Sequence, residues 1–343
     1  MSASKKKITG FFIITIFAAL LGIFSLKSGF LSSYENHTWD RRVRFVARET
    51  YHDPDIKIII IDQQSLDYFN KHESIRWPFP RALYVPVIKF LERAGARAVA
   101  FDILYTEPSV YGADDDNEFA RASAAKIPVV HALALSRSDN KPDTEKLKLL
   151  KAATSVNQSS ELSELLEKIK APHYNSAVLP VKPLLKNTRY FGSVTAAPDS
   201  DGIFRHYRPG GFLQNIPVGT LPFALYATSA GSGWQKKIAR FVDASGNLTV
   251  KFYGGAKTFH TDNIVNIINS EIALEQGRKP IVDPLQYKDS WVFVGVWAPG
   301  LLDLRPVAVD RAYRGVEFNA TVLNNIIKRD FFIKLPAYLN YVF

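Results

Sequence analysis

Five charged side chains in this 343-residue chain stand where they could contact a ligand: Asp62, Arg81, Asp102, Glu107 and Arg205. Asp62 and Asp102 each follow a predicted buried strand, and the carboxyl ends of parallel strands are where α/β sheets bind ligands. Two carboxylates at such an edge can hold a metal, position a hydroxylated ligand or pair with an arginine. Alternatively, both aspartates cap helices and accept hydrogen bonds from loop amides. The residues leave both interpretations open.

Arg81 follows a stiff apolar stretch, Trp-Pro-Phe-Pro, at residues 77–80. Proline fixes φ and is favoured where a helix begins, so Pro80 is expected to start the helix that Arg81 enters. Trp77 and Phe79 are expected to pack over the sheet end as scaffold, with the wall of a pocket as the alternative. The two aromatic side chains are therefore candidates for scaffold, and Arg81 is a candidate for a role in a pocket.

Arg81 is predicted to pair with Asp62 or Asp102, because its loop joins the first strand to the crossover helix. Glu107 stands in the segment after the second strand, close to the same predicted edge. These residues are candidates for a ligand pocket at the end of the sheet.

Arg205 is predicted to lie on a strand after a tight turn formed by Asp199, Asp201 and Gly202. An arginine in this position can hold a carboxylate or a phosphate with two parallel hydrogen bonds. The alternative is an ion pair with an aspartate at the sheet end.

The sequence lacks several common catalytic motifs. Asp62 is followed by Gln63 and Gln64 and not by the Asp-x-Asp of phosphoaspartate enzymes, and no Gly-rich phosphate loop, G-x-S-x-G or H-E-x-x-H is present. The seven histidines are scattered, and the lack of cysteine excludes disulfides and thiolate metal sites. Residues 114–116, all aspartate, are expected in the first turn of a helix and not in a calcium loop. No catalytic residue, metal or cofactor is predicted; a hydrolase using Asp62, Asp102 and a metal is the disfavoured enzymatic alternative.

The elements that would position these residues predict an α/β fold. Buried strands are expected at residues 56–62, 96–105, 127–135 and 291–297. Helical patterns between the first three imply parallel strands with right-handed crossovers. Residues 188–253 alternate apolar and polar side chains around Gly and Asp turns, which is typical of antiparallel hairpins. The expected fold is a mixed, largely parallel central sheet with flanking helices and an antiparallel hairpin portion, preceded by one transmembrane helix.

Two further segments complete this organisation. Residues 139–170 are charged, rich in serine and free of aromatic side chains, which predicts a surface insertion, either a helical hairpin or a loop. Residues 316–330 predict an amphipathic helix that closes the domain.

The N-terminal segment predicts a membrane anchor. Residues 8–26 carry no charged side chain, and a helix of that length spans about 28 Å, close to the thickness of the hydrocarbon core. Lysines at positions 5–7 favour a cytoplasmic N-terminus. We therefore expect a cytoplasmic tail at 1–7, a signal anchor at 8–29, an extracytoplasmic domain at 30–332 and the start of a second membrane segment at 333–343. A cleaved signal peptide is the alternative for the first segment.

A formal net charge of +10 raises the question of nucleic acid as a partner. No aromatic-basic nucleic-acid motif is present, and the predicted sidedness also argues against such a partner. Residues 39–48 are basic and follow the predicted anchor, so they are expected either to lie on anionic lipid headgroups or to form a solvated helix face. The expected partners are the membrane, an external cue and a second copy of the chain in a homodimer.

Several stretches in order resemble one known family. They are Asp40-Arg41-Arg42, IIIIDQQSLDYF, WPFPR, GARAVAFDILYTEP, FGSVTAAPDSDGIFRHYRP, VFVGVWAPGLLDLRPV and RGVEFNATVLNNIIKRDF. Together they resemble the type-2 CHASE domain, the cyclase- and histidine-kinase-associated sensory extracellular domain, over residues 35–332. Phe79 stands where a second tryptophan is common, and residues 139–170 are long for the pattern.

The resemblance implies a periplasmic or extracellular sensor that follows one transmembrane helix of the plasma (inner) membrane. In the family further transmembrane helices and a cytoplasmic output module typically come next. An adenylate or guanylate cyclase is the expected output, and a histidine kinase, a diguanylate cyclase or a Ser/Thr kinase is the alternative. A stand-alone, membrane-anchored binding module is the other hypothesis. The resemblance specifies no ligand, so no binding residue is carried over from the family.

Overall fold

The computed structural model describes residues 3–28, 32–48, 52–157, 160–298 and 303–333. The chain forms two compact units, Met1–Ala47 and Arg48–Phe343. The second predicted membrane segment, residues 333–343, lies outside the described residues except for Ile333.

The first unit contains helices α1 (Ala3–Ser28) and α2 (Ser32–Val46). Helix α1 covers the segment predicted as an anchor, and its described large apolar side chains, such as Phe11, Ile14 and Phe24, are more than half exposed. Within the described residues, no helix is both long enough and apolar enough to cross a membrane.

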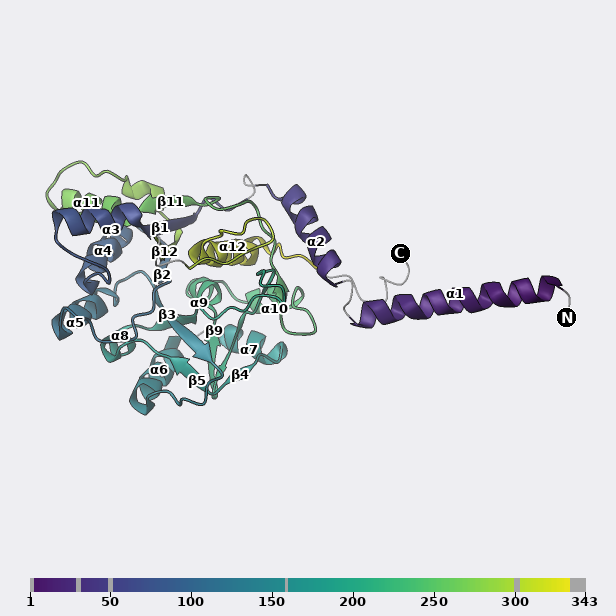
Figure 1. The fold of residues 1–343 in the computed structure, drawn as a ribbon. Helices are drawn as coiled ribbons and strands as arrows, with labels where there is room; N and C mark the ends of the chain where they lie inside the picture. The colour runs from purple at the N-terminus through teal and green to yellow at the C-terminus, as the bar shows by residue number, and fades with distance from the viewer. Residues whose placement is uncertain (1–2, 29–31, 49–51, 158–159, 299–302, 334–343) are drawn as a thin grey trace. The chain divides into compact units, whose positions relative to one another are not determined.

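The second unit is built around a seven-stranded sheet (Figure 1). Its strands are β1 (Ile56–Asp62), β2 (Ala98–Phe101), β3 (Val129–Ser136), β5 (Ser176–Val178), β6 (Tyr190–Ser193), β11 (His260–Asn263) and β12 (Trp291–Trp297). The parallel pairs follow the order β11-β1-β12-β2-β3-β6, and β5 runs antiparallel to β3. The predicted mixed, largely parallel sheet is confirmed.

Strand β12 lies between β1 and β2, although it comes almost 200 residues after β2 in the chain. It pairs with β1 along its whole length, from Ile56 opposite Trp291 to Asp62 opposite Trp297. The order of the strands therefore separates the ends of β1 and β2 by two strand spacings, roughly 10 Å.

Helices cover both faces of the sheet (Figure 1). Helices α3 (Gln63–His72), α4 (Val85–Ala94), α5 (Ala113–Ala122), α8 (Lys182–Asn187) and α11 (Ile264–Glu275) lie on one face, and α9 (Leu221–Ala227) and α12 (Gly315–Lys328) on the other. The isoleucines of β1 explain this arrangement, because Ile59 and Ile61 join the core on the first face while Ile58 and Ile60 join the core on the second.

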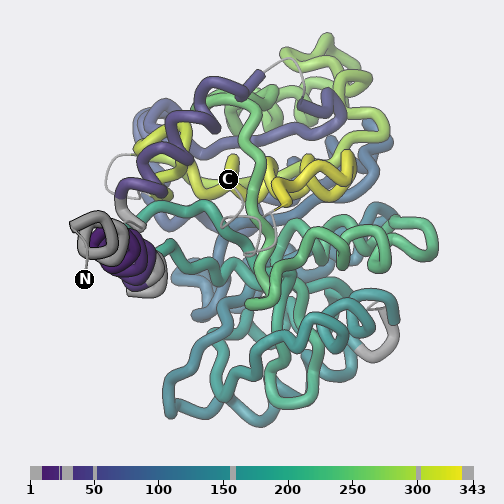
Figure 2. The backbone as a smooth tube through the Cα atoms, turned by 90° about the vertical axis from the view of Figure 1, so that its right-hand side faces the viewer, coloured from purple at the N-terminus to yellow at the C-terminus, as the bar shows by residue number. Residues whose placement is uncertain are grey.

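Helix α12 approaches the central strand very closely. A Cβ atom placed on Gly295 of β12 would lie 2.7 Å from Cβ of Val316, so only glycine leaves room for the helix at this position. In Figure 2 the yellow α12 also runs beside the green segment near residue 250, where the Asn325 side chain accepts from the Lys251 amide and donates to its carbonyl. The helix is thus fixed to both the sheet and the segment near residue 250.

The antiparallel portion lies beside the central sheet. Its strands are β7 (His206–Tyr207), β8 (Gly210–Leu213), β9 (Ile216–Gly219) and β10 (Leu248–Thr249), and the short strand β4 (His173–Tyr174) pairs parallel to β8. The pairs β8–β9 and β7–β10 are antiparallel, as the alternation in residues 188–253 predicts. The unit also contains helix α10 (Trp234–Ala239) and the short 3-10 turns η2 (Arg81–Tyr84) and η3 (Pro284–Tyr287).

Residues 139–170 contain two helices, α6 (Thr144–Asn157) and α7 (Ser160–Lys168). Leu150, Leu162, Leu165 and Leu166 are at most 1% exposed. The segment therefore carries charged side chains outward and attaches to the domain through a row of buried leucines.

Candidate functional site

Two loops meet over the face of the sheet that is covered by α4 and α5. One loop is the stretch from Arg76 to Tyr84, which includes a cis Trp77–Pro78 peptide bond and ends in the 3-10 turn η2. The other connects β2 to α5 and contains residues 103–112. Between them lies a cavity of about 230 Å³, which we call the loop pocket. Four of the residues singled out in the sequence line it: Trp77, Phe79, Arg81 and Glu107.

Asp115 and Asp116, in the first turn of α5, hold the two loops together. The Asp115 carboxylate accepts hydrogen bonds from the backbone amides of Arg81 and Ala82, each at 2.8 Å, and from the Ser109 hydroxyl. The Asp116 carboxylate accepts from the Ser109 amide at 3.1 Å and from the Arg81 guanidinium. Because both carboxylates are buried, these bonds replace the water that each has lost.

Arg81 is buried and bonds at both ends of its guanidinium fork. One Nη pairs with the Asp116 carboxylate, and the other donates to the Glu107 carbonyl oxygen. Burial lowers the pKa of the Arg81 guanidinium, and the neighbouring tyrosine and aspartate groups oppose that effect. The structure thus gives Arg81 a carboxylate partner other than the two predicted from the sequence.

The aromatic residues of the first loop divide into two roles. Phe79 is buried and packs edge-on against Phe69 of α3, with the ring centres 4.8 Å apart. Trp77 is half-buried, contacts Phe79 and lines the loop pocket. Phe79 therefore serves as scaffold, and Trp77 leaves part of its ring for a ligand to contact.

Two tyrosines, Tyr84 and Tyr105, also line the loop pocket. Burial raises the pKa of both phenols, so both remain neutral hydrogen-bond donors at physiological pH. The Arg81 guanidinium lies 5.4 Å from the centre of the Tyr105 ring. Within the described residues the buried Tyr105 hydroxyl has no partner at hydrogen-bond geometry, although it lies close enough to Tyr84 for the two phenols to interact. An apolar wall with neutral donors suits a small ligand that has an apolar body and a polar acceptor.

Asp62 caps a helix. Its Oδ1 accepts from the Ser65 amide and hydroxyl, both at 2.9 Å, and from the Asn263 amide group at 2.6 Å. Ser65 Oγ in turn accepts from the Asp62 amide, which completes a capping box at the start of α3. Helix capping, the alternative to ligand binding, thus accounts for the contacts that Asp62 makes.

Asp102 follows β2 and faces α12 on the opposite side of the sheet from the loop pocket. Its Oδ2 accepts from the Asn319 side chain at 2.9 Å, and Asn319 Oδ1 accepts from the Tyr207 hydroxyl at 3.0 Å. Burial raises the pKa of Asp102 to about 6, even though the nearby positive charge of Arg305 and the Asn319 bond favour the carboxylate. Asn319 and Arg305 are contacts that the sequence did not indicate.

Arg205 is 3% exposed and pairs with the aspartates of its own turn. Its Nη1 lies 2.9 Å from Asp201 Oδ1 and 3.3 Å from Asp199 Oδ2, while Asp199 Oδ1 lies 2.7 Å from His206 Nδ1. These contacts fit the alternative in which Arg205 forms an ion pair. Its partners are aspartates of its own turn and not an aspartate at the sheet end.

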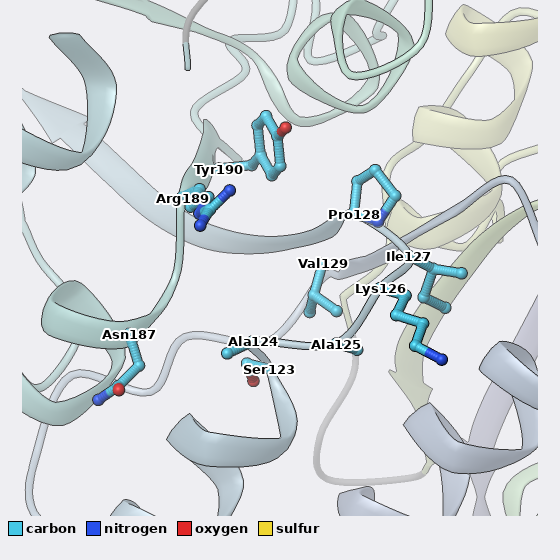
Figure 3. A pocket seen from close by; sticks show the side chains of 10 residues that line it. All are labelled: Ser123, Ala124, Ala125, Lys126, Ile127, Pro128, Val129, Asn187, Arg189 and Tyr190. Carbon is cyan, nitrogen blue, oxygen red and sulfur yellow. The ribbon is translucent and has the colours of Figure 1, made fainter. Parts of the chain in front are cut away.

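The described residues contain no group of three or more acidic, histidine or cysteine side chains that could hold a metal ion. A second cavity of about 300 Å³ lies at the opposite, amino ends of β3 and β6. Figure 3 shows Arg189 and Tyr190 together at the start of β6, whereas the Lys126 ammonium group points away from them. Its two positive charges do not converge, so this cavity is a poor candidate for recognising a charged ligand.

Arg81 and Asp116 form a buried ion pair, here called the clamp, which leads to a first prediction. Replacing Arg81 by methionine leaves a buried carboxylate without its cation, and we expect a loss of about 3–5 kcal/mol in the free energy of unfolding, measured by urea denaturation. The exposed pair Lys89–Glu275 provides the control, since Lys89→Gln should cost less than about 1 kcal/mol. Equal losses in the two variants would contradict the structural role of the clamp.

The raised pKa of Asp102 makes a second prediction. Because the folded state binds this proton more tightly than the unfolded chain, the charged carboxylate opposes folding above pH 6, and this cost disappears as the pH falls toward the ordinary value of 3.8. Asp102→Asn keeps an acceptor for Asn319 and should stabilise the protein by about 1–3 kcal/mol at pH 7.5. The difference from wild type should shrink to near zero at pH 4. A difference that is independent of pH would show that the carboxyl group does not titrate as described.

No curated protein and no solved structure matches the chain. One family model, described as the CHASE2 domain, matches residues 14–342 and so covers both the loop pocket and the sheet that carries it. The chain belongs to the CHASE2 domain family.

Proposed function

We propose that this chain is the extracytoplasmic sensory part of a membrane signalling protein, and that the loop pocket receives its cue. Membership of the CHASE2 family carries the proposal, because it identifies a sensory domain. The loop pocket supports it, since the two loops that form it are joined by hydrogen bonds to the buried carboxylates of Asp115 and Asp116.

Signalling requires a cue that binds two conformations with different affinity. The loop pocket offers a physical basis for such a difference. Arg81 lines the cavity and at the same time joins Asp116 to the Glu107 carbonyl, so a ligand that contacts Arg81 competes with, or reinforces, the bonds between the loops. The change would leave the domain through the chain segments that flank it, helix α2 before residue 48 and helix α12 toward residue 333.

The exposed apolar side chains of α1 and the basic residues near position 5 support a membrane anchor with a cytoplasmic N-terminus. A homodimer held near the membrane and a cytoplasmic nucleotide cyclase as output are the finer parts of the proposal. A histidine kinase, a diguanylate cyclase or a Ser/Thr kinase is the alternative output, and a binding module without output is the alternative function.

The proposed sidedness can be measured with cysteine labelling, because the chain has no cysteine of its own and gives no background. Leu285 is 73% exposed in the main domain, so Leu285→Cys should react with a membrane-impermeant maleimide in intact cells. Ser4→Cys should react only after the cells are permeabilised. The reverse pattern would place the domain in the cytoplasm and contradict the proposal.

The sensory role can be tested in a fusion of residues 1–343, with any native sequence that follows them, to an adenylate cyclase. Because Arg81 joins the two loops, Arg81→Met should change cyclase output at least about twofold at equal membrane expression, a population shift of only a fraction of 1 kcal/mol. Lys89→Gln, which changes an exposed pair, should leave output unaltered. Output that is insensitive to Arg81→Met and to deletions within residues 56–330 would rule out the sensory role.

A further inference from the structure

A cavity separate from the loop pocket opens at the carboxyl ends of β3 and β6. Its volume is about 540 Å³, within the range of small-molecule sites. Ser136 and Arg137 line it at the end of β3, the segment 195–199 lines it after β6, and the strand β7 segment with Asn247 closes it. We call it the sheet-end cavity. Parallel sheets bind ligands at this end of their strands.

The rim of the sheet-end cavity is fixed by hydrogen bonds. The Thr195 hydroxyl accepts from the Leu135 amide at 2.8 Å and donates to the Leu135 carbonyl at 2.9 Å, which holds the segment after β6 against the end of β3. On the other side, Asp199 lies between Arg205 and His206, as described above. A cavity with such a rim is formed before any ligand arrives, which lowers the cost of ordering it on binding.

Two arginines of the lining, Arg137 and Arg208, have no carboxylate partner among the described residues. The Arg137 guanidinium lies 5.8 Å from the centre of the Tyr174 ring, which also lines the cavity. Arg208 donates through Nε to Asn247 Oδ1 at 2.9 Å and through Nη2 to the Ser245 carbonyl at 3.5 Å. These contacts position both guanidinium groups without neutralising either charge, in contrast to the paired Arg81 and Arg205.

The remaining polar groups of the lining add donors. Because Arg208 can only donate, the oxygen of the Asn247 amide must face it, and the Asn247 NH₂ group is left as a further donor. The one carboxylate of the lining, Asp199, is already engaged by Arg205 and His206. The sheet-end cavity therefore presents an excess of donors and of positive charge.

We propose that the sheet-end cavity binds a small soluble oxyanion, a carboxylate or a phosphate monoester, through Arg137 and Arg208. Planar guanidinium groups match both anions with paired, charge-assisted hydrogen bonds. The rings of Tyr174 and Tyr207 supply apolar area for the body of the ligand. This site goes beyond the sensory role and does not depend on it, because a binding measurement requires no output domain.

The test uses isothermal titration calorimetry on the full 343-residue chain in detergent micelles at low salt, with inorganic phosphate and succinate titrated separately. At least one anion should bind with a Kd of about 1 mM or tighter, and added sodium chloride should weaken the binding. Arg208→Gln should weaken it about tenfold or more, as expected for lost hydrogen bonds to a charged ligand. Arg137→Gln, which removes an exposed arginine without a hydrogen bond to any described residue, should weaken it in the same direction. Thermal unfolding of each variant verifies that it is folded.

Arg189→Gln is the matched control, since it removes one positive charge from an exposed arginine beside the other cavity (Figure 3). Its affinity should equal that of wild type. In a second measurement, saturating anion should slow amide hydrogen exchange in residues 195–208 and not in residues 123–129. Absence of binding by both anions up to about 10 mM, or equal weakening by Arg189→Gln and by the two cavity variants, would overturn the proposal.

Discussion

The buried carboxylate pair at the start of α5 is the constraint on which the loop pocket depends. Asp115 and Asp116 cannot remain charged and buried unless donors surround them, because an unpaired buried ion costs several kcal/mol. The chain supplies those donors from three places: the first amides of η2, Ser109 and the Arg81 guanidinium. The two loops are thus held in place by the need to satisfy the carboxylates, and the pocket between them is a consequence. A ligand that reaches Arg81 acts on the same bonds.

The sequence predicted β1, β2, β3 and β12 of the central sheet, but neither the places of β5, β6 and β11 in it nor the order of the strands. Four consecutive isoleucines predict a strand buried on both faces, and the alternation of β1 between two cores confirms it. What no local pattern reveals is that β12 enters between β1 and β2. Asp62 instead bonds to Ser65 and Asn263, and Asp102 to Asn319, while Arg81 pairs with Asp116.

The sequence also predicted only part of the candidate site. The stretch at residues 77–81 and Glu107 do converge, since one lies in the connection from β1 to β2 and the other in the connection from β2 to α5. The partner of Arg81 was missed because acidic residues in a helix's first turn have a sufficient local explanation in the helix dipole. Only the burial of Asp115 and Asp116, a tertiary property, shows that they also have partners elsewhere. Likewise, contacts such as that between Asn319 and Asp102 join residues more than 200 positions apart and leave no local signal.

The late position of the central strand also affects how the domain is made. Until the chain has been synthesised through Trp297, the inner edges of β1 and β2 have no strand between them, and each exposes a row of unpaired backbone groups. Such long-range pairing is slow to form, and the incomplete chain exposes unpaired strand edges that favour aggregation. Completion of the central sheet therefore waits for β12, the last of its strands to be synthesised.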